Sequence, residues 1–396
     1  MKEIKAFKRA DGRVGIRNSV LVISMVSCSN IVTEQIARST GVVPIVHEQG
    51  CTEFEHDHER TRLALIAAGR NPNVGAVLLV GLGCEQTNIG EIRAAIETSG
   101  KPVEALLIQD EGGSPEAVAK GISIVEKLKK EIAGIERTSC PVSGLVVGVQ
   151  CGGSDWTTAL SGNSSIGVMT DLVIRDGGSV LMSEVAGFPG SEHIVASRAV
   201  NREVGLQVLD MISELRSEYI ETYGQKIEEV NPTPGNKAGG ITTLVEKSMG
   251  NIKKMGTSPV QGVVKLGEQI SRPGLWVVDN RAQGPDSFNL TGLAMEGAVI
   301  TVFSSGRGSP VGNAVMPTLK LTGNPETFKK LASIMDFNSG TIIEGKPIEK
   351  VGEELYELLL EIASGKETKS EINGNFEYTI PRESARKRSS VRCPRG

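Results

Sequence analysis

Four of the six cysteines follow short apolar runs that are rich in β-branched residues and that we interpret as β-strands. They are Cys28 after residues 19–26, Cys51 after residues 42–46, Cys84 after residues 75–81, and Cys151 after residues 144–150. Ligands of open α/β sheets bind beyond the carboxyl ends of the strands, so side chains in these positions can meet at one rim. Because thiolates bind soft or borderline metals, including iron, we expect these four cysteines to hold a metal ion. The alternative for each cysteine is a small buried side chain that fills space.

Titratable side chains follow the same predicted strands and are candidates for proton transfer. His47 and His193 lie in turns after strands, each beside a glutamate, and Glu85 follows the third strand in GLGCE. A histidine in such a turn can act as a base, an acid or a metal ligand. Together with Lys247, these residues form the predicted catalytic set. A metal that chelates a 2-hydroxy acid would acidify the proton beside the carboxylate and stabilise the enediolate.

A second group of residues is suited to binding an anion. Lys237 lies in PGNKAGG and Arg307 in SSGRGSP, where glycines let backbone amides and positive charge converge on a carboxylate. Lys247, in TTLVEKS, belongs to the same basic group, and its alternative role is that of a solvated residue on a helix face. Asp155, after the fifth strand, and Asn18, in DGRVGIRN, complete the predicted substrate contacts. The loop that carries Asn18 could equally serve only to pack the N-terminus.

These side chains must be positioned by a repeated pattern of strand, turn and helix. Apolar runs of about five to eight residues alternate with amphipathic stretches, which predicts βα units, a mostly parallel sheet and the α/β class. The loop at residues 231–240 suggests a boundary, followed by a T-x-x-E capping box at Thr243. We therefore expect an α/β domain over residues 1–230, a smaller α/β domain over 231–380, and a disordered tail over 381–396.

Composition excludes several classes of protein. The chain has 396 residues and a formal net charge of −4, which argues against nucleic acid as the main partner. Its apolar runs are far shorter than the ~20 residues that cross a bilayer, so we expect no membrane association. The start, MKEIKAFKRADGR, lacks the apolar stretch of a secretory signal. We expect a cytoplasmic protein that forms a homo-oligomer and acts on a small hydroxy acid.

Longer motifs point to a known family. The stretches FKRADGRVGIRN, HEQGC, NPNVGAVLLVGLGCE, QCGGSD, SEVAGFPGSEH, NPTPGNKAGGITTLVEKSMG, SSGRGSPVG and ASGKETKSE occur in this order. They resemble the altronate/galactarate dehydratase family, in its large catalytic region, over about residues 6–378. The resemblance implies an α/β fold of unusual topology and a hydro-lyase that converts a sugar acid to a 2-keto-3-deoxy acid. It also implies Fe²⁺ or another divalent metal such as Mn²⁺, and it leaves an iron–sulfur cluster open.

The chain departs from the family pattern in ways that leave alternatives open. Many relatives carry a small N-terminal domain, so a separate small subunit is a possible partner. Residues 154–167 and 277–287 differ from the family pattern in the expected substrate loops, which leaves the identity of the sugar acid open. The similar large subunit of sulfolactate sulfo-lyase implies sulfite as an alternative leaving group. A non-catalytic scaffold is a further alternative, whereas a dinucleotide-dependent dehydrogenase is disfavoured because SCSN, and no G-x-G-x-x-G, follows the first strand.

Overall fold

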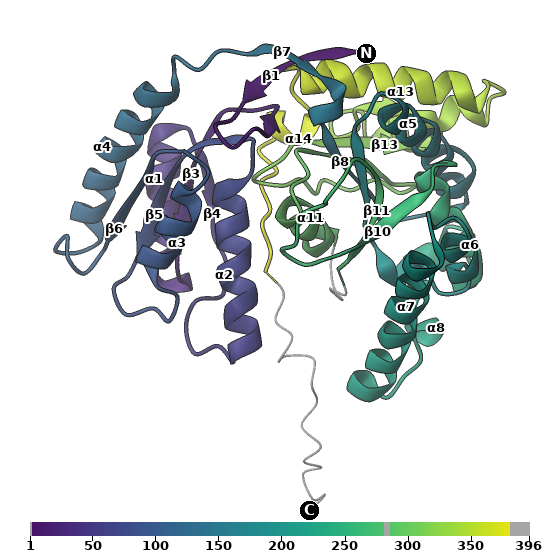
Figure 1. Ribbon diagram of the computed structural model, residues 1–396, viewed down its shortest axis with the longest axis horizontal. Coiled ribbons are helices and arrows are strands. Elements are labelled where there is room, and N and C mark those ends of the chain that lie inside the picture. Colours follow the sequence, from purple (N-terminus) through teal and green to yellow (C-terminus); the bar gives the residue numbers. More distant parts are fainter. Residues whose placement is uncertain (1, 281–285, 381–396) are drawn as a thin grey trace, which may run out of the picture.

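The computed structural model describes residues 2–280 and 286–380, which form two α/β units (Figure 1). The N-terminal unit has a parallel four-stranded sheet in the order β4-β3-β5-β6. Its strands are β3 (Ser19–Ser24), β4 (Val43–Ile45), β5 (Val74–Gly81) and β6 (Val103–Leu107). Its helices are α1 (Asn30–Thr40), α2 (Glu55–Arg70), α3 (Ile89–Glu97) and α4 (Ser114–Ile132). All residues of β5 are buried, as expected for a central strand covered by helices on both faces.

The C-terminal unit is built on a parallel sheet of seven strands in the order β10-β11-β9-β8-β12-β13-β14. The strands are β8 (Val146–Cys151), β9 (Ser179–Met182), β10 (Val260–Lys265), β11 (Gly274–Asp279), β12 (Ile300–Ser304), β13 (Thr318–Thr322) and β14 (Phe337–Asn338). The helices around it include α5 (Asn163–Arg175), α6 (Glu192–Ser197), α7 (Arg202–Tyr223), α8 (Ile227–Val230), α9 (Pro234–Ala238), α10 (Leu244–Asn251), α11 (Asp286–Met295), α12 (Pro325–Lys330), α13 (Ile348–Ala363) and α14 (Lys369–Ile372). The α/β class and the parallel pairing predicted from the sequence are therefore confirmed.

The seven-stranded sheet draws strands from both sides of residues 230–240, the predicted domain boundary. Strands β8 and β9 precede that segment, yet β9 pairs with β11 and β8 pairs with β12. The chain instead passes from one sheet to the other between β6 and β8, and the C-terminal unit carries the larger sheet. Between them, β7 (Thr138–Pro141) pairs antiparallel with β1 (Glu3–Lys8), which also pairs with β2 (Val14–Gly15). The predicted tail over 381–396 lies outside the described residues.

The two units share one hydrophobic core, in which α2 packs against α11. Leu65 of α2 and Leu79 of β5 belong to the same buried cluster as Leu290 of α11 and Phe303 of β12. Burial of such side chains contributes about 1.5–3 kcal/mol each, so this shared core helps to hold the units together.

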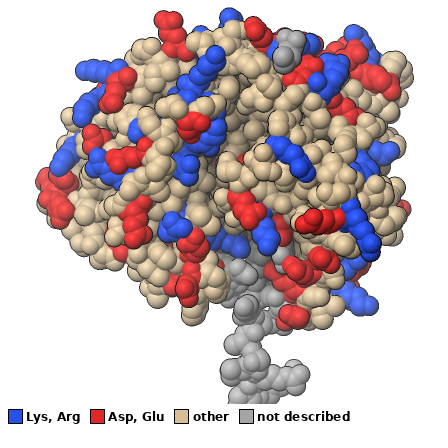
Figure 2. All heavy atoms as spheres, in the orientation of Figure 1, with Lys and Arg blue, Asp and Glu red and all other residues tan. Residues whose placement is uncertain are grey.

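Charge on the surface is mixed in sign. Figure 2 shows lysine and arginine side chains interspersed with aspartate and glutamate over the face in view. No helix of the described ranges combines the length and apolar character that crossing a membrane would require.

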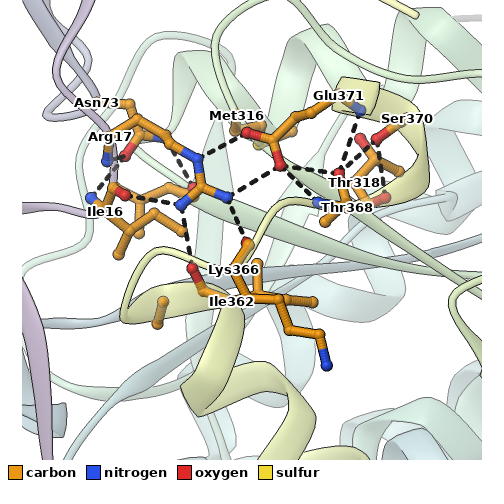
Figure 3. Close-up of polar contacts among 12 residues, drawn as sticks. Ile16, Arg17, Asn73, Met316, Thr318, Ile362, Lys366, Thr368, Ser370 and Glu371 are labelled. Carbon is orange, nitrogen blue, oxygen red and sulfur yellow. Dashed lines mark hydrogen bonds and ion pairs between the residues drawn. The ribbon is translucent and has the colours of Figure 1, made fainter. Parts of the chain in front are cut away.

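Arg17 joins the N-terminal region to the end of the described chain (Figure 3). Its guanidinium donates to both carboxylate oxygens of Glu371, over 2.6 and 2.9 Å. It also donates to the carbonyl oxygens of Ile362 and Lys366. Glu371 is held in turn by Thr368, which caps α14. The bidentate geometry makes this pair a defined connection and not a loose surface contact.

Candidate active site

A cavity of about 440 Å³ lies at the carboxyl ends of β8, β9 and β11 in the C-terminal unit. Its polar and charged lining residues include Cys151, Glu184, Asn231, Thr233, Asn236, Lys247, Asn280, Asp286 and Asn289. The position agrees with the rule that open parallel sheets bind ligands beyond the carboxyl ends of their strands.

Glu184 occupies the turn after β9 in a strained conformation. Its φ of 69° and ψ of 52° fall in the left-handed region, which is unusual for a residue with a side chain. Its Oε2 accepts a hydrogen bond from Sγ of Cys151 at 3.0 Å, and its Oε1 lies 3.5 Å from Nζ of Lys247. Strain of this kind is retained where the surrounding contacts over-determine the conformation, and it is concentrated at functional sites.

Lys247 is brought to the cavity by α10. The helix begins with the capping box predicted from the sequence, in which Thr243 and Glu246 bond reciprocally to each other's backbone N–H. The Nζ of Lys247 donates to Oδ1 of Asn231 over 3.0 Å. Lys247 is the one lysine or arginine among the described residues that line the cavity.

Behind the cavity wall, Lys254 is fully buried beside Cys151 and Glu184. Its Nζ donates to Sγ of Cys151 over 2.9 Å and to Oε2 of Glu184 over 3.4 Å. Burial alone would raise the pKa of Glu184. The positive charges of Lys254 and Lys247 outweigh that effect and hold the pKa below its ordinary value. Burial, together with the charge of Glu184, raises the pKa of Cys151, which favours the neutral thiol.

Asp286 supplies a second carboxyl group to the cavity. It is the first residue of α11, and burial, together with the charge of Glu184, raises its pKa to about 6. Its close approach to the end of β8 requires glycine at residue 152, because a Cβ there would lie 2.1 Å from Oδ2 of Asp286. A carboxyl with a pKa near neutrality, in a cavity, is typical of general acid–base catalysis.

Neutral amide and hydroxyl groups form much of the remaining wall. Asn236 caps α9 reciprocally with Thr233, and its Nδ2 donates to the carbonyl oxygen of Ser154 over 2.9 Å. Asn280 follows β11 and Asn289 lies on α11. Such groups both donate and accept hydrogen bonds, which suits the hydroxyls of a polyhydroxylated ligand.

Comparison with known proteins identifies the family. The family profile described as "D-galactarate/Altronate dehydratase, C-terminal" matches residues 142–385, and that described as "D-galactarate dehydratase/Altronate hydrolase, second domain" matches residues 6–133. This chain belongs to the altronate/galactarate dehydratase family. Membership of this family confirms the prediction that the protein is an enzyme. The gap between the two matched regions, at residues 134–141, lies where the chain passes from one sheet to the other.

Individual relatives include both dehydratases and a sulfo-lyase subunit. The altronate dehydratase of Bacillus subtilis is 35% identical over 392 residues, which cover 96% of this chain and 77% of the relative. Galactarate dehydratase (L-threo-forming) of Escherichia coli is 36% identical over 304 residues, covering 75% of this chain and 57% of the relative. The (2R)-sulfolactate sulfo-lyase subunit beta of Chromohalobacter salexigens is 32% identical over 379 residues, covering 95% and 96%.

Of the residues predicted for this family member's site, Lys247 and Cys151 line the cavity. Asp155 lines a neighbouring depression of about 250 Å³ that shares both residues. Its Oδ1 accepts hydrogen bonds from the backbone N–H of Thr157 and Thr158, so this oxygen caps the following helical turn. The side chain of Asp155 thus supports the site's frame.

Two predicted anion-binding residues lie outside the cavity lining. Lys237 is exposed on α9, and Arg307 is exposed and donates to the carbonyl oxygen of Gly235 over 3.0 Å. Neither is among the described residues that line the cavity. His193, predicted as catalytic, is likewise exposed on α6 and absent from that lining.

The other predicted site residues belong to the N-terminal unit and have local partners. His47 is buried, with Nε2 2.8 Å from the carbonyl oxygen of Ser24 and Nδ1 accepting from the backbone N–H of Gln49. Asn18 accepts from Arg9 and donates to the carbonyl oxygen of Ile132. Glu85 accepts from the backbone N–H of Gly83 over 2.7 Å. These contacts support local structure and do not join the cavity.

The four predicted metal ligands are divided between the two sheets. Cys28, Cys51 and Cys84 are exposed at the carboxyl end of the four-stranded sheet, whereas Cys151 is buried at the end of β8. Across residues 2–280 and 286–380, no three histidine, cysteine, aspartate or glutamate side chains converge so that they could hold a metal ion. The predicted set therefore does not fit a shared ion.

The predicted site did not include three residues that lie in or directly behind the cavity wall, namely Glu184, Asp286 and Lys254. Glu184 directly ends the sixth apolar run, and its strand-end position is a signal that could have selected it. Asp286 lies in the segment 277–287 that already stood out as a substrate loop. Lys254, in NIKKMG, has the sequence context of an ordinary solvated lysine, and only its complete burial distinguishes it.

Proposed function

We propose that the protein is a sugar-acid dehydratase that removes water from a 2,3-dihydroxy acid and yields a 2-keto-3-deoxy acid. The observation that carries the proposal is the pairing, in one cavity, of the Asp286 carboxyl with the Lys247 ammonium and an amide-rich wall. The names of the dehydratase relatives support the same reaction class.

Asp286 is the proton-transfer group in this proposal. Its carboxylate takes the proton from C2, beside the substrate carboxylate, and its pKa of about 6 suits exchange near neutral pH. The proton then passes to the hydroxyl that leaves C3, so water departs and the Asp286 carboxylate is restored. The enol that remains tautomerises to the ketone.

Lys247 stabilises the charge that develops during proton removal. Negative charge accumulates on the substrate carboxylate as C2 loses its proton, and a fixed ammonium lowers the energy of that state. Glu184, 3.5 Å from Nζ, and Asn231, 3.0 Å away, hold the ammonium in place. Lys247, predicted as catalytic from the sequence, keeps a role in this mechanism as an electrostatic group.

The lining favours a sugar acid over a sulfonate. Its ionisable residues include two carboxyls, Glu184 and Asp286, and one ammonium, Lys247, whereas its amides match hydroxyl groups. A substrate that carries a sulfonate as well as a carboxylate would add negative charge without a second cation in this lining. Sulfite release remains the alternative, because the chain covers 96% of the sulfo-lyase subunit beta.

Metal dependence and a small partner subunit remain predictions. The cysteines named for Fe²⁺ or Mn²⁺ do not converge, so the steps above use only side chains of this chain. A relative whose name is subunit beta supports testing the protein both alone and with a small partner.

The test is a turnover assay of the purified protein on altronate, galactarate and sulfolactate, with and without added Fe²⁺, Mn²⁺ and a small partner subunit. We expect 2-keto-3-deoxy acid and no sulfite. Asp286→Asn and Lys247→Met should lower kcat by about 100-fold or more, as for loss of a proton-transfer or charge-stabilising group. The exposed Asp210→Asn and Lys226→Met serve as matched controls with unchanged kcat. Sulfite release, or full activity in Asp286→Asn, would overturn the proposal.

A further inference from the structure

Lys254 is a buried charge that the proposed reaction does not use. Its side chain has 0% exposure, and Lys254 is not among the described residues that line the cavity. A buried ammonium is costly unless acceptors surround it, so the groups around Lys254 decide whether its charge is tolerated.

Three acceptors surround this ammonium, one for each of its N–H groups. They are Sγ of Cys151 at 2.9 Å, Oδ1 of Asn251 at 2.6 Å and Oε2 of Glu184 at 3.4 Å. One sulfur and two oxygens around a central positive charge form a donor set that would equally suit a borderline divalent metal. An ammonium carries three donors and no acceptor, so its hydrogen-bonding capacity is filled.

The donor set is held rigidly by its own contacts. Asn251 donates from Nδ2 to the carbonyl oxygen of Gly187 over 3.2 Å, which directs its Oδ1 toward Lys254. Asn163 donates to the carbonyl oxygen of Gly250 over 2.9 Å and lies 3.9 Å from Sγ of Cys151. The cluster is therefore held in place by protein groups alone.

We propose that the Lys254 ammonium is the built-in cation of the Cys151–Glu184–Asn251 cluster and takes the place that a thiolate-bound metal ion would need. The inference concerns the cavity of the proposed function, but it is independent of which group leaves the substrate. It explains why a buried lysine lies at the centre of a donor set that contains Cys151, the one predicted ligand in the cavity.

The experiment is a titration with Co²⁺ in the absence of oxygen, read from the thiolate-to-cobalt charge-transfer absorbance. Wild type and Cys151→Ser should give the same spectrum, because only thiols outside the cluster contribute. Lys254→Ala should bind Co²⁺ at least tenfold more tightly than wild type, with a new band that disappears in Lys254→Ala/Cys151→Ser. The exposed neighbour Lys253→Ala should behave as wild type.

Two results would overturn the inference. One is a Cys151-dependent cobalt band in wild type, which would mean that a metal displaces the ammonium. This result is read by comparing wild type with Cys151→Ser, so it holds even if Lys254→Ala does not fold. The other is a folded Lys254→Ala protein with no gain of Cys151-dependent binding. Loss of dehydratase activity in any variant bears on the proposed function and not on this result.

Discussion

His47 and Asp286 are buried titratable side chains whose environments give them different roles. Both nitrogens of His47 have backbone partners, and burial lowers its pKa to about 4, so it stays neutral in the folded protein. Burial and the charge of Glu184 instead raise the pKa of Asp286, which also faces a cavity. The first environment suits a structural histidine, and the second suits a group that exchanges protons.

The neutral state of His47 predicts acid sensitivity. Its folded pKa of about 4 lies below the ordinary 6.5, so the unfolded chain binds the proton first as the pH falls. The free energy that the neutral His47 contributes to folding is fully present above pH 6.5. It is lost progressively toward pH 4, by roughly 3 kcal/mol. Urea unfolding at several pH values should show this loss in wild type and a smaller loss in His47→Gln. The exposed His193→Gln is the control, and an unchanged pH dependence in His47→Gln would contradict the assignment.

Asp286 predicts an acidic limb in the activity profile. The proposed base must be ionised, so kcat/KM should fall as the pH drops below about 6, the pKa to which the carboxyl is raised. The residual activity of Asp286→Asn should lack this limb. If kcat/KM of Asp286→Asn fell at low pH as it does in wild type, the fall would have to come from the titration of another group. Measuring kcat/KM from pH 5 to pH 8 makes the comparison.

At the scale of elements, short connections after the strands bring the reactive groups together. The turn after β8 carries Gly152, whose missing side chain makes room for the Asp286 carboxyl at the start of α11. The turn after β9 carries Glu184 in its left-handed conformation. The helix α10 adds Lys247 from a segment more than sixty residues farther along the chain.

Gly152→Ala is therefore expected to damage catalysis. The new Cβ would overlap Asp286 and displace it, and a misplacement of about 1 Å costs on the order of 100-fold in rate. The matched control is Gly134→Ala, because a Cβ at Gly134 meets no atom within 4 Å. Steady-state kinetics and a circular dichroism spectrum of both variants separate lost catalysis from lost folding. Wild-type kcat/KM in Gly152→Ala would contradict this account of the turn.

At the scale of the whole molecule, the two units are held by a shared core and by the connection from Arg17 to Glu371. Arg17 lies before β3, whereas Glu371 lies near the end of the described chain, so this connection joins segments 354 positions apart in the sequence. Both residues occur in motifs, DGRVGIRN and ASGKETKSE, that carried the family resemblance. Their structural role accounts for these motifs without a place in the cavity.

Removing Arg17 should destabilise the protein. The Arg17 and Glu371 side chains are only 14% and 18% exposed, so Arg17→Ala leaves a poorly hydrated carboxylate and should cost about 3 kcal/mol. Arg17→Lys should recover only part of this, because lysine cannot bond bidentately. Arg62→Ala, which breaks a more exposed pair with Glu59, should cost less than about 1 kcal/mol. Equal losses of unfolding free energy in Arg17→Ala and Arg62→Ala would contradict the role of this connection.

Local sequence patterns predict the class of the fold, most strand positions and two residues of the cavity. Apolar runs of strand length that alternate with amphipathic helices are local patterns, so the sequence predicts them directly. Placement at a strand end selected Cys151, and membership of the basic group selected Lys247, which lies in TTLVEKS. The same local pattern recurs in every βα unit, so it does not specify which strands pair. The loop at residues 231–240 therefore does not separate the two sheets, and the four predicted cysteines do not share one rim, because the strands that precede them belong to two different sheets.

Tertiary structure alone decided the sheet to which each strand belongs and the burial of each charge. Pairing of β8 with β12 joins residues about 150 positions apart, and no local pattern encodes that distance. Lys253 and Lys254 are neighbours in sequence, yet one is exposed and the other has no contact with solvent. The cost of burying an ammonium depends on the acceptors that the fold places around it, and those come from three separate segments of the chain.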